Sequence, residues 1–326
     1  LYWMQQSQRA EYNHALEYAV QQANKQGRML LVAFGLADDY PEANLRHYTF
    51  MLEGLKETQE GLASRGIKLV VRRGQPPEVA LTLGHRASMM VCDRGYLRHQ
   101  NAWRDQVAQE ANCRVVQVES DVIVPVEVVS DKAEYAARTI RPKIHRHLDA
   151  YLVGIKSIAV KHPSLAMRIQ GIDLDNTSDL LQKLNLDRSV RPVSGLFNGG
   201  TTQAAKRFGA FIRHRLKHYD QHSNQPQTDD ISHMSPYLHF GQISPLFLAQ
   251  QISRAPNTLK AAKDSYLEEL VVRRELAINF AFYTSNYDAY GCIPGWAQKT
   301  LADHQDDQRE YVYTRRQLEN ADTHDP

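Results

Sequence analysis

Ile231-Ser-His-Met-Ser-Pro-Tyr-Leu-His-Phe-Gly241 is predicted to form a hydroxyl-rich turn that runs into a helix. Ser232 and Ser235 are candidate N-cap residues, and Pro236 is of the type favoured at the first helical position. A helix start with free backbone N–H groups and nearby hydroxyl groups can bind an anion. An ordinary capped helix explains the same pattern, so the turn alone leaves both interpretations open.

The helix predicted over Ser265–Phe280 has an acid and a base among apolar residues. At about 100° per residue, Glu269 and Arg273 share one arc with apolar neighbours, while Glu268 and Glu275 point to solvent. A helix that is apolar nearly all round is a buried helix. Glu269 and Arg273 also have the four-residue spacing of a side-chain pair. Such a pair either fixes the packing of a buried helix or faces a ligand.

These two stretches resemble the photolyase/cryptochrome family, and the resemblance covers essentially the whole chain. Ser232-x-x-Ser-Pro-Tyr-Leu-His-Phe-Gly-Gln-Ile-Ser244 is similar to the flavin-phosphate turn of that family. Glu269-Leu-Val-Val-Arg-Arg-Glu275 is similar to its flavin- and substrate-facing helix, in a version that resembles class II cyclobutane pyrimidine dimer photolyases. The resemblance implies light-driven repair of DNA containing pyrimidine dimers, in which excited reduced FAD donates an electron to the dimer and the cyclobutane ring splits.

The resemblance also implies roles for individual residues. Backbone N–H groups and hydroxyls of residues 231–235 are expected to hold the flavin phosphates, with positive charge added by Arg273. Glu269 is the expected catalytic residue, facing a dimer that is flipped out of the duplex. The expected flavin-binding residues are Tyr219, Ile231, Ser232, His233, Met234, Ser235 and Arg273. The expected DNA-binding residues are Glu269, Arg141, Lys143 and Arg213.

The composition indicates a globular protein of two domains, since 326 residues exceed a typical single core. Hydrophobic residues make up 42% and charged residues 23% of the chain. Its three cysteines lack the spacing of a metal site, so we expect no metal and reduced thiols in the cytoplasm. No run approaches the ~20 apolar residues of a membrane span, and no signal peptide is visible. We expect a monomer, associated with the nucleoid or, in a eukaryote, nuclear.

Positive charge is concentrated in the middle of the chain. Residues 131–222 contain 16 lysines and arginines and 8 acidic residues, a balance of +8 against +2 for the whole chain. A basic segment of this kind favours contact with a polyanion such as DNA, although a solvated basic face explains it as well. Histidines and arginines cluster over Asp131–His147, but the spacing supplies no carboxylate or thiol ligand. We therefore expect a solvated or DNA-facing basic linker that passes into helical structure, and no metal site.

Strands and helices alternate through the N-terminal part. Apolar runs predict strands over Leu1–Met4, Met29–Phe34, Ile67–Val71, Ala87–Cys92 and Arg114–Val118. Helical spacing predicts helices over Arg9–Asn24, Arg46–Ser64 and Asn101–Ala111, with a short helix through Val79 and Leu83. This alternation predicts an α/β doubly wound parallel sheet.

We expect that sheet to occupy residues 1–130, followed by a linker and first helices over 131–197 and an all-α flavin-binding domain over 198–326. Parallel sheets bind ligands at the carboxyl ends of their strands, where Phe34–Asp39 and Cys92–Tyr96 are the candidate loops. No glycine-rich dinucleotide motif follows the first strand. The resemblance implies a second, antenna chromophore of deazaflavin or folate type in this domain.

Both ends of the chain suggest a fragment, because it opens on the strand-like Leu1-Tyr-Trp-Met and stops at a helix entry. The resemblance places the remaining flavin contacts and the electron-transfer tryptophans beyond Pro326, so we expect this chain alone to bind FAD poorly and to repair little. Two other functions stay open. One is a cryptochrome-like flavin photoreceptor, and the other is a two-domain protein that binds an adenine nucleotide.

Overall fold

The computed structural model describes residues 1–325, which fall into two compact units, Leu1–Tyr283 and the residues from Thr284 onward. The domain boundaries predicted after residues 130 and 197 both lie inside the first unit and stay predictions. Among the described residues, no helix is long and apolar enough to span a membrane.

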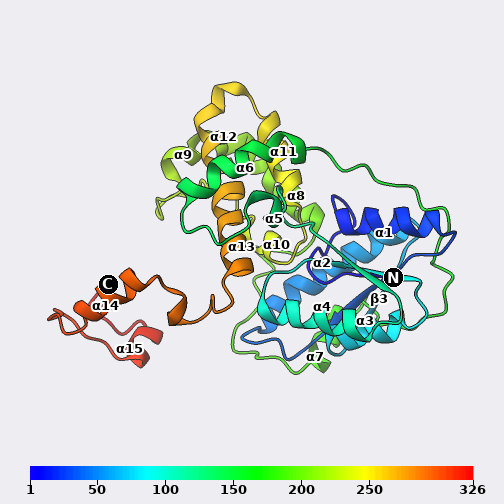
Figure 1. Ribbon diagram of the computed structural model, residues 1–326. Coiled ribbons are helices and arrows are strands. Elements are labelled where there is room, and N and C mark those ends of the chain that lie inside the picture. Colours follow the sequence, from blue (N-terminus) through cyan, green and yellow to red (C-terminus); the bar gives the residue numbers. More distant parts are fainter. Residues whose placement is uncertain (326) are drawn as a thin grey trace. The chain divides into compact units, whose positions relative to one another are not determined.

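A parallel sheet of five strands, in the order β3-β2-β1-β4-β5, forms the N-terminal part of the first unit (Figure 1). Its central strand β1 pairs Tyr2 with Val32 on one side and with Val91 on the other. All six residues of β2 are buried, as its continuous apolar run predicted. The strands are β1 (Tyr2–Trp3), β2 (Leu31–Leu36), β3 (Lys68–Arg73), β4 (Met89–Asp93) and β5 (Arg114–Val118). The predicted doubly wound α/β fold is therefore confirmed.

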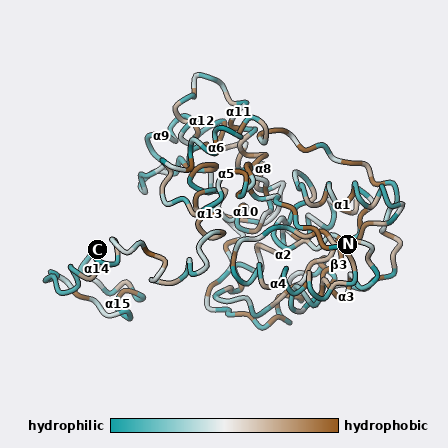
Figure 2. Tube along the Cα trace, in the orientation of Figure 1, coloured by the Kyte–Doolittle hydropathy of each residue, from teal (hydrophilic) through white to brown (hydrophobic). Residues whose placement is uncertain are grey.

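Helices cover both faces of this sheet. Successive strand residues point to opposite faces, and the apolar side chains on each face need a helix layer to bury them. Tyr2 packs in one core with α1 and α2, whereas Trp3 packs in another with α3 and α4. Figure 2 shows hydrophobic residues along the strands around the N-terminus. The helices are α1 (His14–Lys25), α2 (Leu45–Ser64), α3 (Pro76–Gly84) and α4 (Arg98–Glu110). The predicted start of α1 at Arg9 is wrong, since Asn13 caps the helix and Arg9 is buried in polar contacts before it.

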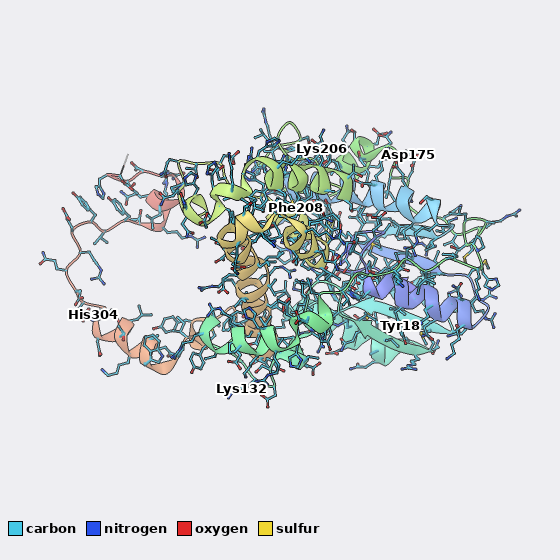
Figure 3. All side chains as sticks on the ribbon, turned by 90° about the horizontal axis from the view of Figure 1, so that it is seen from above. Tyr18, Lys132, Asp175, Lys206, Phe208 and His304 are labelled. Atoms are coloured by element: carbon cyan, nitrogen blue, oxygen red, sulfur yellow. The ribbon has the colours of Figure 1, made fainter. Side chains whose placement is uncertain are left out.

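Helices follow the sheet domain and share a core of aromatic rings. Phe208 stacks on Phe211 and lies 5.7 Å from the ring of Tyr266, while Lys206 on the same helix points outward (Figure 3). The first of these helices are α5 (Val126–Val129), α6 (Ala137–Tyr151), α7 (Thr177–Lys183), α8 (Thr201–His214), η1 (Leu216–His218) and α9 (Tyr219–His222). They continue with α10 (Ser235–His239), α11 (Pro245–Arg254), η2 (Asn257–Leu259), α12 (Lys260–Leu267), the π-helical turn η3 (Glu268–Arg273) and α13 (Arg274–Tyr283).

Two connecting segments contain helices. The basic segment 131–147, expected to lead from a linker into helical structure, enters the helix α6 at Ala137, and Ile140 and Ile144 of this helix are fully buried. Residues 170–191, which are mostly polar and charged, contain α7, and Leu180 of this helix reaches the core beside α2. In both segments, a few apolar residues at helical spacing suffice to bury one face.

The second unit contains η4 (Tyr290–Cys292), α14 (Gly295–Asp303) and α15 (Arg315–Glu319). Trp296 is the second residue of α14. No residue of these helices is buried within the described chain, and Trp296 is 75% exposed.

Candidate functional site

The hydroxyl-rich turn leads directly into α10, but its serines do not cap that helix. Met234 is the N-cap residue, Ser235 is the first helical residue and Pro236 the second. The predicted caps at Ser232 and Ser235 are therefore wrong. The hydroxyl of Ser232 instead accepts from the backbone N–H of Met234 at 3.4 Å and from the hydroxyl of Tyr266 at 3.2 Å. Ser232 thus closes the turn and joins it to the end of α12.

His233, in the middle of this turn, has a left-handed backbone with φ of +56°. This conformation crowds the Cβ of any residue other than glycine. Its imidazole Nε2 lies 2.5 Å from a carboxylate oxygen of Asp229, and its ring meets the edge of Phe197. Successive backbone N–H groups around a left-handed residue can form a concave anion site, so the conformation suits the expected phosphate contact.

Two tyrosines connect the turn with the acid predicted to be catalytic. The ring of Tyr266, which donates to Ser232, packs edge-on against Tyr219 at 5.2 Å. Burial, and after it the negative charge of Glu269, raises the pKa of Tyr219. The carboxylate of Glu269 therefore lies close enough to Tyr219 to influence its hydroxyl, and Tyr219 stays a neutral hydrogen-bond donor at neutral pH.

The predicted pair of Glu269 and Arg273 is wrong. Arg273 donates instead to Glu268 at 3.2 Å, and Arg141 donates two hydrogen bonds to the same carboxylate at 2.7 and 2.9 Å. Arg141, followed by Arg273, lowers the pKa of Glu268. Because η3 is π-helical, residues five apart meet along its axis, whereas the prediction assumed α-helical spacing.

Glu269 itself is exposed and has no ion-pair partner among the described residues. The prediction of a helix buried all round is wrong on this side, since Arg273 and Ala277 are exposed too. Glu269 therefore offers a carboxylate without an ion pair in the described part of the chain, and its negative charge acts on Tyr219. A carboxylate without a cation can accept hydrogen bonds from a bound ligand.

Glu275, predicted to face solvent, is only 4% exposed and accepts from the backbone N–H of Ile123 at 2.6 Å. Burial raises the pKa of Glu275 to about 8, although the two backbone N–H groups that it binds act to lower this pKa. Further along α13, Asn279 bonds Glu134 N–H at 2.7 Å and Tyr283 donates to Ser130 at 2.6 Å. Sequence reasoning missed this anchoring stripe, although its four-residue spacing along one helix was a readable signal.

The three basic residues expected to bind DNA are not brought together as free charges. Arg141 is bonded to Glu268, and Lys143 is bonded to the buried Glu134 and to Ser130. Arg213, near the end of α8, is exposed. Their assignment to DNA stays a prediction, with Arg213 the residue of the three that is exposed to solvent.

Two cavities adjoin α10. A cavity of about 450 Å³ lies between α2 and α10, with Phe50, Phe197 and Phe240 in its wall. A second, of about 350 Å³, contacts Gln6 after β1 and Tyr96 after β4, and also Arg274 and Ile278 of α13.

The second cavity lies at the ends of β1 and β4, the two strands between which the strand order reverses. From β1 the chain continues to β2 and β3 on one side of the sheet, whereas β4 and β5 lie on the other side of β1. Such switch points are the usual ligand sites of parallel sheets. Of the two candidate loops, Cys92–Tyr96 borders this cavity through Tyr96, whereas Phe34–Asp39 lines neither cavity.

Comparisons with known proteins agree with this arrangement. Residues 1–164 match the sequence family described as DNA photolyase. The deoxyribodipyrimidine photo-lyase of Methanothermobacter thermautotrophicus is 46% identical over 326 residues, which are 100% of this chain and 71% of that protein. That of Potorous tridactylus is 37% identical over 100% of this chain and 61% of that protein.

Solved structures share the fold. A cryptochrome of Synechocystis sp. PCC6803 superposes with a TM-score of 0.68 at 17% identity, over 86% of this chain and 61% of that one. A class III photolyase from Agrobacterium tumefaciens superposes with a TM-score of 0.67 at 16% identity, over 93% of this chain and 64% of that one.

Proposed function

The chain belongs to the DNA photolyase family, and we propose that it acts in the light-driven repair of cyclobutane pyrimidine dimers in DNA with FAD as cofactor. One set of contacts supports this most. Ser232 in the turn that contains the left-handed His233 is bonded to Tyr266, whose ring packs against Tyr219, and the negative charge of Glu269, which has no ion-pair partner among the described residues, acts on Tyr219. A phosphate-binding turn connected through two tyrosines to such a carboxylate suits a flavin nucleotide beside a pyrimidine base.

The residues present fit the cofactor. Backbone N–H groups of residues 231–235 would bind the pyrophosphate, since their chain bends around a left-handed residue. The Tyr219 hydroxyl would donate to a cofactor or substrate oxygen, because burial keeps it protonated. Arg273 would add positive charge, reduced by its bond to Glu268. Bound FAD supplies the photoexcited electron that opens the cyclobutane ring; the protein binds and orients the reactants.

Glu269 would receive the flipped dimer. Pyrimidine rings carry N–H donors on the edge that pairs in the duplex, and a carboxylate with no other partner can accept from them. Glu268 cannot take this role, because both of its carboxylate oxygens accept hydrogen bonds from Arg141, and one of them also accepts from Arg273. Extrusion of the lesion would be offset partly by contacts between basic residues such as Arg213 and phosphates.

We further propose the class II branch of the family, on the Val-Val-Arg-Arg-Glu-Leu sequence after Glu269. The cavity at the switch point is lined by Ser235 as well as by Tyr96 and Arg274, so it adjoins the proposed flavin site. A second, antenna chromophore stays a prediction. The monomeric state and the cytoplasmic or nuclear location stay predictions.

The test is a repair assay on an oligonucleotide with a single thymine dimer, with the purified full-length protein under reducing conditions and blue light. Wild-type protein should hold flavin and restore the dimer to thymines. Glu269→Gln should retain flavin but repair at least tenfold more slowly, as expected for removal of a charged hydrogen-bond acceptor.

The matched control is Glu268→Gln, one residue away, which should lower thermal stability but leave repair per bound flavin within about twofold. Equal repair by wild type and Glu269→Gln would refute the role of Glu269. Flavin without repair in the wild type would favour the photoreceptor, and a protein without flavin would favour the adenine-nucleotide alternative.

A further inference from the structure

Asp229 lies just before the phosphate turn, and its carboxylate connects two groups. One oxygen lies 2.5 Å from Nε2 of His233, and the other lies 3.0 Å from the guanidinium of Arg215. Arg215 is the C-cap residue of α8, a helix anchored in the aromatic core through Phe208 and Phe211. The three residues Arg215, Asp229 and His233 therefore link the turn to a rigid helix; we call them the Asp229 clamp.

The residue held by this clamp is the strained one. His233 has φ of +56°, a conformation that is roughly tenfold less populated for residues with a Cβ than the right-handed one. Besides Asp229, its ring contacts Phe197, over which the guanidinium of Arg207 lies at 4.3 Å. The side chain of His233 is thus fixed from both sides while its backbone is in an unfavourable conformation.

The neighbouring residue Asp230 has a different role. Its carboxylate lies 2.5 Å from Nδ1 of His222 on α9, and it has no contact with His233 among the described residues. The hydrogen bond with the His222 imidazole is the main cause that lowers the pKa of Asp230. Of the two adjacent aspartates, Asp229 is the one bonded to His233, whereas Asp230 is bonded to His222 and is influenced by Arg215 through charge alone.

We infer that Asp229 is a positioning residue for the cofactor phosphates. This inference rests on the proposed function. Asp229 acts through His233, because its carboxylate holds the backbone of residue 233 in the left-handed conformation and so keeps residues 231–235 in the form that binds pyrophosphate. Without the clamp, residue 233 relaxes to a right-handed backbone in most molecules. The apparent affinity for the phosphate-bearing ligand is then the intrinsic affinity multiplied by the fraction of molecules in which residue 233 is still left-handed.

The inference predicts a coupling between positions 229 and 233 that a general structural role would not produce. Glycine adopts φ of +56° without steric cost, so a protein with glycine at position 233 has no need of the clamp. Asp229→Ala should therefore weaken FAD binding about five- to tenfold in the wild-type background. In the His233→Gly background, the same substitution should change FAD affinity less than about twofold.

The experiment is a double-mutant cycle on the full-length protein, with titrations of FAD and of riboflavin, which lacks the phosphates. Asp230→Ala is the matched control and should leave FAD affinity within about twofold. Asp229→Ala should leave riboflavin affinity and the unfolding midpoint of the ligand-free protein close to wild type, which shows that the variant is folded. Asp229→Asn keeps an oxygen for His233 and should restore most of the FAD affinity.

Each other result decides against the inference. Equal losses from Asp229→Ala in the two backgrounds would mean that Asp229 acts through Arg215 or through general stability. Equal losses for FAD and riboflavin would mean that the phosphates are not involved. A wild-type protein that binds no FAD would overturn the proposed function and this inference together, whereas normal FAD binding without coupling would overturn the inference alone.

Discussion

Glu275 gives a quantitative prediction for stability. Its side chain is 4% exposed, and one oxygen binds the N–H groups of Ile123 and Val124, at 2.6 and 3.4 Å. Its other oxygen has no hydrogen-bond partner among the described residues. No lysine or arginine forms an ion pair with it in that part of the chain, so burial dominates and raises the pKa to about 8. The protonated form is therefore the one that the folded chain favours.

The sign of the pH dependence follows from this. Between an ordinary glutamate pKa of 4.5 and the folded value of about 8, the unfolded chain has lost the proton and the folded chain keeps it. Stability therefore falls as the pH rises through this window, by about 1.4 kcal/mol for each pH unit. Over the whole window, the loss reaches at most about 5 kcal/mol, less where the folded chain relaxes to admit water.

Glu275→Gln tests this value, because an amide has the shape of the protonated carboxyl and does not titrate. At pH 5 the variant should be within about 1 kcal/mol of the wild type, since Ile123 keeps its acceptor. At pH 8 the variant should be the more stable protein. The assay is urea denaturation, followed by circular dichroism, at half-unit steps from pH 5 to pH 8. At each pH, the free energy of unfolding of the variant is subtracted from that of the wild type, so the histidine titrations that both proteins share cancel.

Glu268→Gln serves as the control, because Arg141 lowers the pKa of Glu268 and its effect on stability is confined to more acidic solutions. Its curve should run parallel to that of the wild type above pH 5. If the Glu275→Gln curve also runs parallel to the wild type from pH 5 to pH 8, then Glu275 is ionised in the folded chain and the reasoning from burial is refuted.

Further predictions concern the backbone, a buried charge and DNA. Gly27 and Gly241 both have φ of +63°, but an added Cβ would lie 2.1 Å from the carbonyl oxygen of Gln6 at Gly241 and within 4 Å of nothing at Gly27. Gly241→Ala should therefore unfold at lower urea than Gly27→Ala, which should cost about 1 kcal/mol. Arg9→Ala should destabilise by about 3–5 kcal/mol in the same assay, because Asp121 then remains buried without its 2.7 Å partner. In DNA-binding titrations at several salt concentrations, Arg213→Ala should reduce the slope of log K against log salt by about 1; an unchanged slope would exclude Arg213 from the DNA contact.

Local sequence patterns were sufficient for most of the fold. The strand Arg114–Val118 was predicted with its observed bounds, and α2 within one residue, because apolar runs and helical spacing are short-range signals. The errors concern contacts with distant parts of the chain. Glu275 was assigned to solvent because its partner Ile123 lies 152 residues away. No periodicity in a single helix reveals such a partner.

The site was predicted in part for the same reason. The turn at residues 231–235 was identified from its sequence, but its left-handed residue and the bond from Tyr266 to Ser232 depend on the packing of α12 against it. Histidine is enriched among the few non-glycine residues at positive φ, but this statistical tendency alone did not identify His233 as left-handed. No sequence pattern singled out Asp229, because its two partners become its neighbours only in the folded chain.

The π-helical turn has a chemical consequence that the α-helical interpretation would miss. In an unbroken α-helix, Glu269 and Arg273 would lie about 40° apart around the axis and Glu268 and Arg273 about 140° apart. Arg273 would then neutralise Glu269. The wider turn brings residues five apart together, so Arg273 pairs with Glu268. Among the described residues Glu269, whose charge acts on Tyr219, is left without an ion-pair partner. A helix with two adjacent glutamates and one nearby arginine thus keeps one acid for structure and leaves the other available, which is the arrangement that the proposed recognition of a pyrimidine edge requires.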